Sequence, residues 1–180
     1  MIFEKPGKAN TQKTIELALK AAQEQNVRYI VIASNCGDSV RLLIGSGLNV
    51  VCVTHVNGFA EKGKNEMPSE VRSDLMEKGI QILTTSHVLS GVERAFSTKF
   101  SGVYPTEIMA HTLRMFGQGT KVCVEIAIMA LDAGMIPYGE KIIAVGGTGR
   151  GADTAVVMTP SHAQYVLETR IHEIICKPGL

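Results

Sequence analysis

The stretch Tyr29-Ile-Val-Ile-Ala33, followed by Ser34-Asn-Cys-Gly-Asp-Ser39, decides how the chain folds. The first five residues form a short apolar run rich in β-branched side chains, which is typical of a buried strand in a parallel sheet. The next six residues are small or polar and lead into a new apolar segment at Val40. This order predicts a buried strand that feeds a loop and then the start of a helix.

The same alternation extends in both directions. Before this stretch, Ile15, Ala18, Leu19 and Ala22 recur at helical spacing after Asn10 or Thr11, either of which is a good N-cap. Further strands are expected over residues 49–54, 80–83, 140–145, 155–158 and 171–176. Further helices are expected over residues 40–44, 68–79, 91–99 and 120–133, and from Pro105 with Ile108, Met109, Leu113 and Phe116 facing inward.

These elements predict a three-layer α/β fold with an open, mainly parallel sheet of six strands and helices on both faces. Successive β-α units need right-handed crossovers, which place helices over the sheet. The last strands lie close together in the sequence, so one antiparallel edge is expected. No repeat or linker interrupts the pattern, and residues 1–180 are predicted to form a single domain. Ligands of such sheets bind at the carboxyl ends of the strands.

Composition excludes several classes of protein. The formal net charge is +1 with both signs scattered, which argues against a nucleic-acid partner. No apolar segment reaches the ~18 residues of a membrane span, and the first residues show no secretory signal. The four cysteines lie far apart without a CxxC pair, as expected of reduced thiols in a cytoplasmic protein.

The clearest candidate site is the glycine-rich stretch Gly146-Gly-Thr-Gly-Arg-Gly151, which follows an expected strand and continues to Asp153. Glycines let a backbone approach a ligand and turn amide groups toward an anion, and Arg150 could hold a phosphate with two hydrogen bonds. The stretch matches neither a P-loop nor a dinucleotide fingerprint, because a strand follows it. An ordinary turn between two strands is the alternative.

The second candidate is the loop Ser34–Ser39, where a helix start could bind a phosphate. Asp38 or Ser39 could equally well only cap the helix. Cys36 lies in this loop, but no partner base is evident, so it is not assigned as a nucleophile.

A third candidate loop begins where the second strand ends, with Thr54, His55, Gly58 and Phe59. Ser86 and His87 follow the next strand. Two histidines on adjacent strand ends are expected to share a cleft, although a lone histidine is more often structural. His55, His87 and Asp153 could hold a metal, but the sequence has no supporting helical pair of ligands, and no metal is expected.

Glu125 is the only charged residue between Val122 and Leu131 in an otherwise apolar helix. Such a carboxylate must reach solvent, a ligand or a partner. An ion pair with Arg114 or Arg94 is the expected arrangement.

Read together, these segments resemble the C-terminal α/β domain of pyruvate kinase, and more closely a stand-alone archaeal and bacterial family of such domains. The segments that carry the resemblance are FEKPGKANT, ASNCGDS, THVNGF, SHVLSGVERA, PTEIMAHTLRMFGQGTKVCVEIAIMALDAG, GGTGRGADTAVVMTPSH and RIHEII. The resemblance implies a phosphate in the loop Ser34–Ser39 and a glycine-rich loop, Gly146–Asp153, that closes over the ligand. In the first loop, Asn35-Cys36-Gly37-Asp38 departs from the family pattern, and Asp38 would repel a phosphate.

The stand-alone family looks like a family of flavin mononucleotide (FMN) binders, so FMN is the cofactor that the resemblance implies. Phosphate contacts are then expected from Gly37, Ser39, Gly146, Gly147 and Thr148, and ring contacts from Thr54, His55, Phe59 and His87. The full set of expected binding residues also includes Ser34, Asn35, Cys36, Asp38, Gly58, Ser86, Arg150 and Asp153.

The expected function is binding of FMN or a similar phosphorylated ligand. A flavin-dependent oxidoreductase and a regulatory module that senses a sugar phosphate are alternatives. Another is an interaction protein whose ligand stabilises a homo-oligomer. Pyruvate kinase activity is not expected, because its chemistry needs a TIM barrel of about 250 residues.

Overall fold

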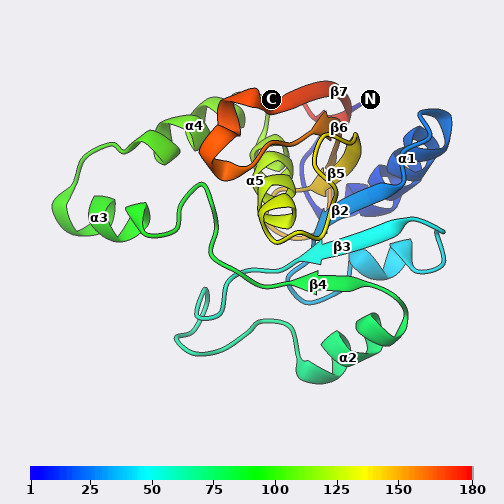
Figure 1. The fold of residues 1–180 in the computed structure, drawn as a ribbon, viewed down its shortest axis with the longest axis horizontal. Coiled ribbons are helices and arrows are strands. Elements are labelled where there is room, and N and C mark those ends of the chain that lie inside the picture. Colours follow the sequence, from blue (N-terminus) through cyan, green and yellow to red (C-terminus); the bar gives the residue numbers. More distant parts are fainter. Residues whose placement is uncertain (180) are drawn as a thin grey trace.

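The computed structural model describes residues 1–179 and shows one sheet with helices on both faces (Figure 1). The strands are β1 (Ile2–Phe3), β2 (Tyr29–Ala33), β3 (Asn49–Val53), β4 (Gln81–Leu83), β5 (Ile142–Gly146), β6 (Thr154–Thr159) and β7 (Arg170–Pro178). The helices are α1 (Thr11–Glu24), α2 (Ser69–Glu77), α3 (Glu93–Phe100), α4 (Pro105–Arg114) and α5 (Gln118–Asp132). Short 3-10 turns cover Lys8–Asn10, Val40–Leu43 and Ala163–Glu168.

The strand order is β1-β7-β6-β5-β2-β3-β4. β5, β2, β3 and β4 are parallel neighbours, and β1 is parallel to β7. β6 is antiparallel to both β5 and β7. The three-layer, mainly parallel α/β fold is therefore confirmed, with two corrections. The antiparallel strand lies inside the sheet, and the two-residue β1, too short to carry a pattern, makes a seventh strand.

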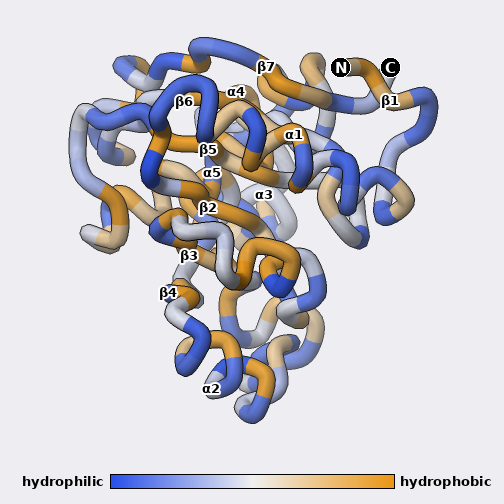
Figure 2. The backbone as a smooth tube through the Cα atoms, turned by 90° about the vertical axis from the view of Figure 1, so that its right-hand side faces the viewer, coloured by the Kyte–Doolittle hydropathy of each residue, from blue (hydrophilic) through white to orange (hydrophobic). Residues whose placement is uncertain are grey.

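Alternate residues of the strands are buried against helices on opposite faces. On β2, Ile30 and Ile32 belong to a core cluster covered by α1, the turn Val40–Leu43 and α2. Val31 belongs to a second cluster under α5. Hydrophobic residues follow the central strands in Figure 2. Burial on both faces explains why these strands are apolar without alternation.

Helix α5 is buried along most of its length, as its composition predicts. α4 packs on α5 rather than on the sheet, and this corrects the expected inward face of α4. Met109 and Leu113 contact the core, but Ile108 and Phe116 are exposed. The expected helix over residues 40–44 is only the 3-10 turn Val40–Leu43.

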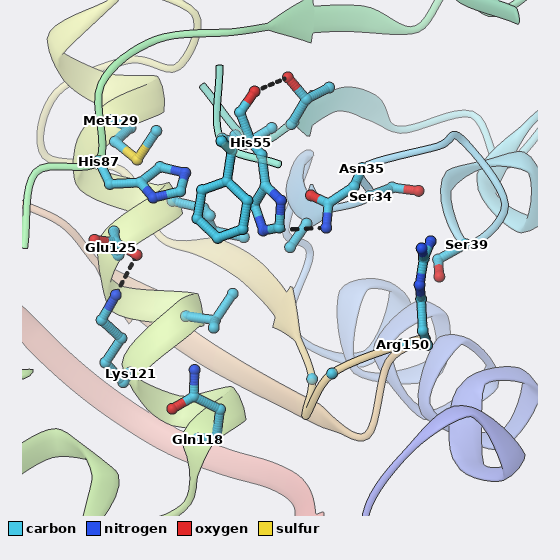
Figure 3. A pocket seen from close by; sticks show the side chains of 18 of the residues that line it. Ser34, Asn35, Ser39, His55, His87, Gln118, Lys121, Glu125, Met129 and Arg150 are labelled. Atoms are coloured by element: carbon cyan, nitrogen blue, oxygen red, sulfur yellow. Dashed lines mark hydrogen bonds and ion pairs between the residues drawn. The ribbon is translucent and has the colours of Figure 1, made fainter. Parts of the chain in front are cut away.

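The four parallel strands β5, β2, β3 and β4 all end at one edge of the sheet. The chain leaves this edge through the loops that follow Ala33, Val53, Leu83 and Gly146, and α5 starts beside them (Figures 1 and 3). The fold therefore brings all three candidate loops together. Within residues 1–179, no helix combines the length and hydrophobicity that crossing a bilayer requires.

Candidate functional site

A cavity of about 290 Å³ lies at the carboxyl ends of these strands, bounded on one side by α5 (Figure 3). Most of the residues that the sequence singles out line it. These are Ser34, Asn35, Cys36, Asp38, Ser39, Thr54, His55, Phe59, His87, Gly147 and Arg150. The lining leaves out Gly37, Gly58, Ser86, Gly146, Thr148 and Asp153.

His55 is held at both ring nitrogens. Its Nδ1 lies 2.5 Å from Glu66 Oε2, and its Nε2 lies 3.1 Å from Asn35 Nδ2. A carboxylate only accepts hydrogen bonds, so Nδ1 donates to Glu66 and Nε2 accepts from the Asn35 amide. Glu66 was not predicted from the sequence; its only signal is its place in the long polar loop after β3. The pair fixes the orientation of the imidazole at the cavity wall.

Three rings form an aromatic cluster at the cavity. Phe59 stacks on His55 with ring centroids 3.7 Å apart, and His87 meets His55 edge-on at 5.5 Å. Phe59 is 46% exposed, so one side of its ring remains open to solvent. The two histidines therefore share one cleft, as their positions on adjacent strand ends predict.

A buried ion pair forms the deep wall of the cavity. Lys121 Nζ contacts Glu125 Oε2 one turn further along α5, and Glu125 Oε1 accepts a hydrogen bond of 3.0 Å from Leu89 N–H. The expected partners of Glu125, Arg114 and Arg94, are therefore corrected to Lys121. A lysine four residues away on the same helix is the nearer cation, because such residues share a helix face.

The environment of this wall disfavours positive charge. Burial lowers the pKa of Lys121, and the Glu125 carboxylate opposes that shift. Burial also lowers the pKa of His87, again opposed by Glu125. Both effects follow from the cost of moving a charged group out of water.

Cations from the helical side were not predicted to line the site. Arg94, Arg114 and Lys121 line it from α3, α4 and α5, together with Gln118. Arg114 Nε donates to Gln118 Oε1 at 2.7 Å, which orients its guanidinium. No local sequence pattern identifies these residues as part of a binding site, since the helices in which they lie have ordinary sequence patterns. Their convergence comes from the packing of α4 on α5.

The loop Ser34–Ser39 lies against the cavity without forming a helix start of any length. Ser34 and Ser39 are buried, and the four-residue 3-10 turn after Ser39 adds little helix dipole. Gly37 has a φ of +92°, and a Cβ there would lie 2.7 Å from Val71 Cγ1. This glycine is thus required for packing against α2.

The glycine-rich loop is built around Asp153. Its carboxylate is fully buried and accepts hydrogen bonds from Gly7 N–H at 2.9 Å, Thr148 N–H at 3.1 Å and the Thr154 hydroxyl at 2.8 Å. A Cβ on Gly147 would collide with the carbonyl oxygen of Gly151. The N–H groups of Thr148, Ala152 and Asp153 are therefore bonded within the fold.

Gly58, Ser86 and Gly146 lie outside the cavity lining. Gly146 is the last residue of β5 and pairs with Thr154. Gly58 lies in a turn with a φ of +84°, where its N–H donates to Lys64 O, and Ser86 is exposed. Arg150 reaches the cavity and its Nη1 lies 3.3 Å from Cys36 Sγ. Among residues 1–179, no three His, Cys, Asp or Glu side chains converge as a metal site would require.

Comparison with known proteins identifies the domain. A family model described as "Pyruvate kinase, alpha/beta domain" matches residues 12–158. Solved pyruvate kinases from Cryptosporidium parvum are similar to the chain. One is 14% identical with a TM-score of 0.42 and covers 82% of this chain and 22% of its own. Another is 15% identical with a TM-score of 0.39 and covers 76% and 20%. The chain thus spans about a fifth of the length of these enzymes, and it belongs to the pyruvate kinase α/β domain family.

Proposed function

We propose that this protein binds FMN, or a similar phosphorylated ligand with a flat ring, and has no pyruvate kinase activity. The observation that carries the proposal is one cavity lined both by an aromatic cluster and by more cationic side chains than carboxylates. Cavities that bind small molecules are mostly apolar with a few well-placed polar groups.

The ring-binding side has the character that a flavin requires. Besides His55, Phe59 and His87, the cavity is lined by the apolar side chains of Val53 and Met129. Aromatic surfaces bind planar ligands by offset stacking. The Oδ1 of Asn35 adds a hydrogen-bond acceptor for the polar edge of a ring, while both nitrogens of His55 are already bonded within the protein.

The charge of the lining favours an anionic ligand. Four cations, Arg94, Arg114, Lys121 and Arg150, face the two carboxylates of Asp38 and Glu125. Clefts with an excess of one charge concentrate ligands of the opposite charge. A phosphate-bearing molecule therefore fits better than a neutral one.

One observation favours a second candidate, a flavin-dependent oxidoreductase. Binding alone does not need the buried Lys121–Glu125 pair beside His87, and burying ions is costly. A flavin would supply the redox chemistry, while protein charges near the ring tune its potential. In this reading, Lys121 would stabilise negative charge on a reduced ring, and His87, whose pKa is lowered by burial, would hold or release a proton.

The first experiment is the absorption spectrum of the purified protein, followed by mass spectrometry of any released ligand and titration with FMN. Yellow protein with near-stoichiometric FMN supports the proposal, and its reduction by NAD(P)H with turnover of an acceptor supports the oxidoreductase. Colourless protein that fails to bind added FMN rejects both.

A matched pair of variants tests the ring-binding surface. Phe59→Ala removes the stacking ring and is expected to weaken FMN binding about ten-fold, because aromatic stacking and buried ring area together contribute on the order of 1–2 kcal/mol. Phe100→Ala removes a ring that is also exposed but does not line the cavity, and should leave FMN affinity unchanged. Equal affinities of the two variants would exclude Phe59 from the site. A substitution at Gly147 is less informative, because any Cβ there disrupts the loop itself.

A further inference from the structure

Helix α3 (Glu93–Phe100) lacks an apolar partner within its own chain. None of its eight residues is buried, and none belongs to either core cluster of residues 1–179. Its tie to α4 is polar, because the Glu93 carboxylate accepts a hydrogen bond of 3.0 Å from Thr106 N–H. Figure 1 shows α3 and its flanking loops standing away from the sheet. Helices shorter than about 12 residues are marginal in water and gain most of their stability by packing an apolar face, so α3 needs a surface to pack against.

One side of α3 is apolar and open to solvent. Val92, Phe96 and Phe100 follow one another at intervals of four residues, which places them on one face of the helix. They are 74%, 46% and 64% exposed, and Val103, just after the helix, is 76% exposed. The ring centroid of Phe96 lies 6.1 Å from that of Phe100 and 6.4 Å from that of Tyr104. We call Val92, Phe96, Phe100 and Val103 the α3 stripe.

The α3 stripe faces away from the main cavity. Arg94 lines that cavity, and residues two positions apart in a helix lie on nearly opposite sides of its axis, so Phe96 points the other way. The members of the stripe are accordingly not among the lining residues. A ligand in the cavity therefore leaves the stripe uncovered.

The size of the α3 stripe matches a small protein–protein interface. Side chains with these exposed fractions present roughly 500 Å² of apolar surface, and patches of roughly 300–600 Å² often mark interaction sites. Two such surfaces packed together bury roughly 1,000 Å² in total, which is the lower limit for a specific interface. A second copy of the chain supplies a matching surface wherever the first copy is present.

We propose that the α3 stripe packs against the α3 stripe of a second copy of this chain, in an antiparallel helix pair with its two-fold axis near Phe96. A two-fold interface brings the same patch of both copies together. Lys99, whose Nζ lies 5.6 Å from the ring centroid of Phe100, then lies on opposite sides of the axis in the two copies, so these like charges are not opposed. The pairing gives a short helix the apolar cover that its own chain lacks, and it does not depend on the ligand of the main cavity.

Sedimentation velocity between about 1 and 200 µM tests the pairing, because an interface of this size is weak. The wild type should form a dimer of the 19.4 kDa chain. Phe96→Glu places a charge at the centre of the helix pair and should weaken dimerisation about a hundred-fold, as loss of a central aromatic anchor does. The control is Met76→Glu, which changes an exposed apolar side chain of α2 and should leave dimerisation unchanged. Both variants should keep the far-UV circular dichroism of the wild type, since only exposed side chains are replaced.

Amide hydrogen exchange locates the contact. In the wild type, exchange at residues 93–100 should slow as the protein concentration rises, whereas in Phe96→Glu it should stay fast at every concentration. A wild type that stays monomeric over the whole range would overturn the proposal, and so would a Phe96→Glu variant that dimerises as the wild type does. Protection that appears with concentration only in other elements would reject α3 as the contact.

Discussion

The loops Gly146–Asp153 and Thr54–Glu66 leave the carboxyl ends of β5 and β3, the two parallel neighbours of β2, yet they present different groups to the cavity. In the first, the Asp153 carboxylate collects donors from three parts of the chain and is fully buried. In the second, Glu66 orients His55 so that the imidazole lines the cavity. The first loop is anchored by Asp153 and lines the cavity with Gly147, Gly149, Arg150 and Gly151, while the second lines it with the rings of His55 and Phe59.

This difference shows what a glycine-rich segment does and does not indicate. Gly147 is required because the loop folds back on its own backbone, a need that exists with or without a phosphate. A glycine-rich pattern indicates that another group approaches the backbone closely. It does not say whether the approaching group is a ligand or the protein itself.

The largest expected effect is that of Asp153→Ala. It leaves two backbone N–H groups and one hydroxyl without their acceptor, and each hydrogen bond to a charged group contributes about 1.5–3 kcal/mol. The free energy of unfolding, measured by urea denaturation, should fall by about 4.5–9 kcal/mol.

The control is Asp132→Ala, which removes a carboxylate that accepts from His162 and Ala163 but is partly exposed. It should cost less than about 1.5 kcal/mol, because solvent replaces the lost bonds. Similar costs for both variants would show that Asp153 does not hold its loop together.

Lys121→Met tests the cavity wall and is expected to lower the free energy of unfolding by about 3–5 kcal/mol, since it leaves Glu125 buried without its cation. The double variant Lys121→Met/Glu125→Gln removes both charges and keeps an acceptor for Leu89 N–H, so most of the loss should be recovered. FMN affinity should fall in both variants if Lys121 also serves the ligand. A double variant no more stable than the single one would contradict the ion-pair explanation.

The smallest effect concerns His87 and pH. Burial lowers the pKa of His87 in the folded protein below its ordinary value of 6.5, so the unfolded chain takes up the proton first as the pH falls. The contribution of His87 to the pH dependence is therefore a loss of stability that begins as the pH drops below about 6.5. In urea denaturation at pH 7.5 and 5.5, His87→Gln should lose less stability on acidification than the wild type.

His111→Gln is the control for this experiment, because His111 is an exposed histidine outside the cavity. It should behave as the wild type does. A steeper loss of stability in His87→Gln than in the wild type would contradict the burial of this imidazole.

The sequence by itself determined the α/β fold and the edge of the sheet where a ligand would bind. The apolar, β-branched composition of runs such as Tyr29–Ala33 predicts that they are buried. Loops that follow parallel strands must meet at one edge of the sheet. Asn35, His55 and His87 could therefore be placed together, because each lies within four residues of the end of a strand.

Only the tertiary structure decided which other groups join them. Glu66, Arg94, Arg114 and Lys121 reach the cavity through the packing of helices and a long loop, which no local spacing encodes. It also decided that Asp153 faces inward and that β6 lies inside the sheet rather than at its edge. The physical reason is the range of the interactions: burial and strand propensity act between near neighbours, whereas a hydrogen bond such as Gly7 N–H to Asp153 forms only when distant segments are already packed.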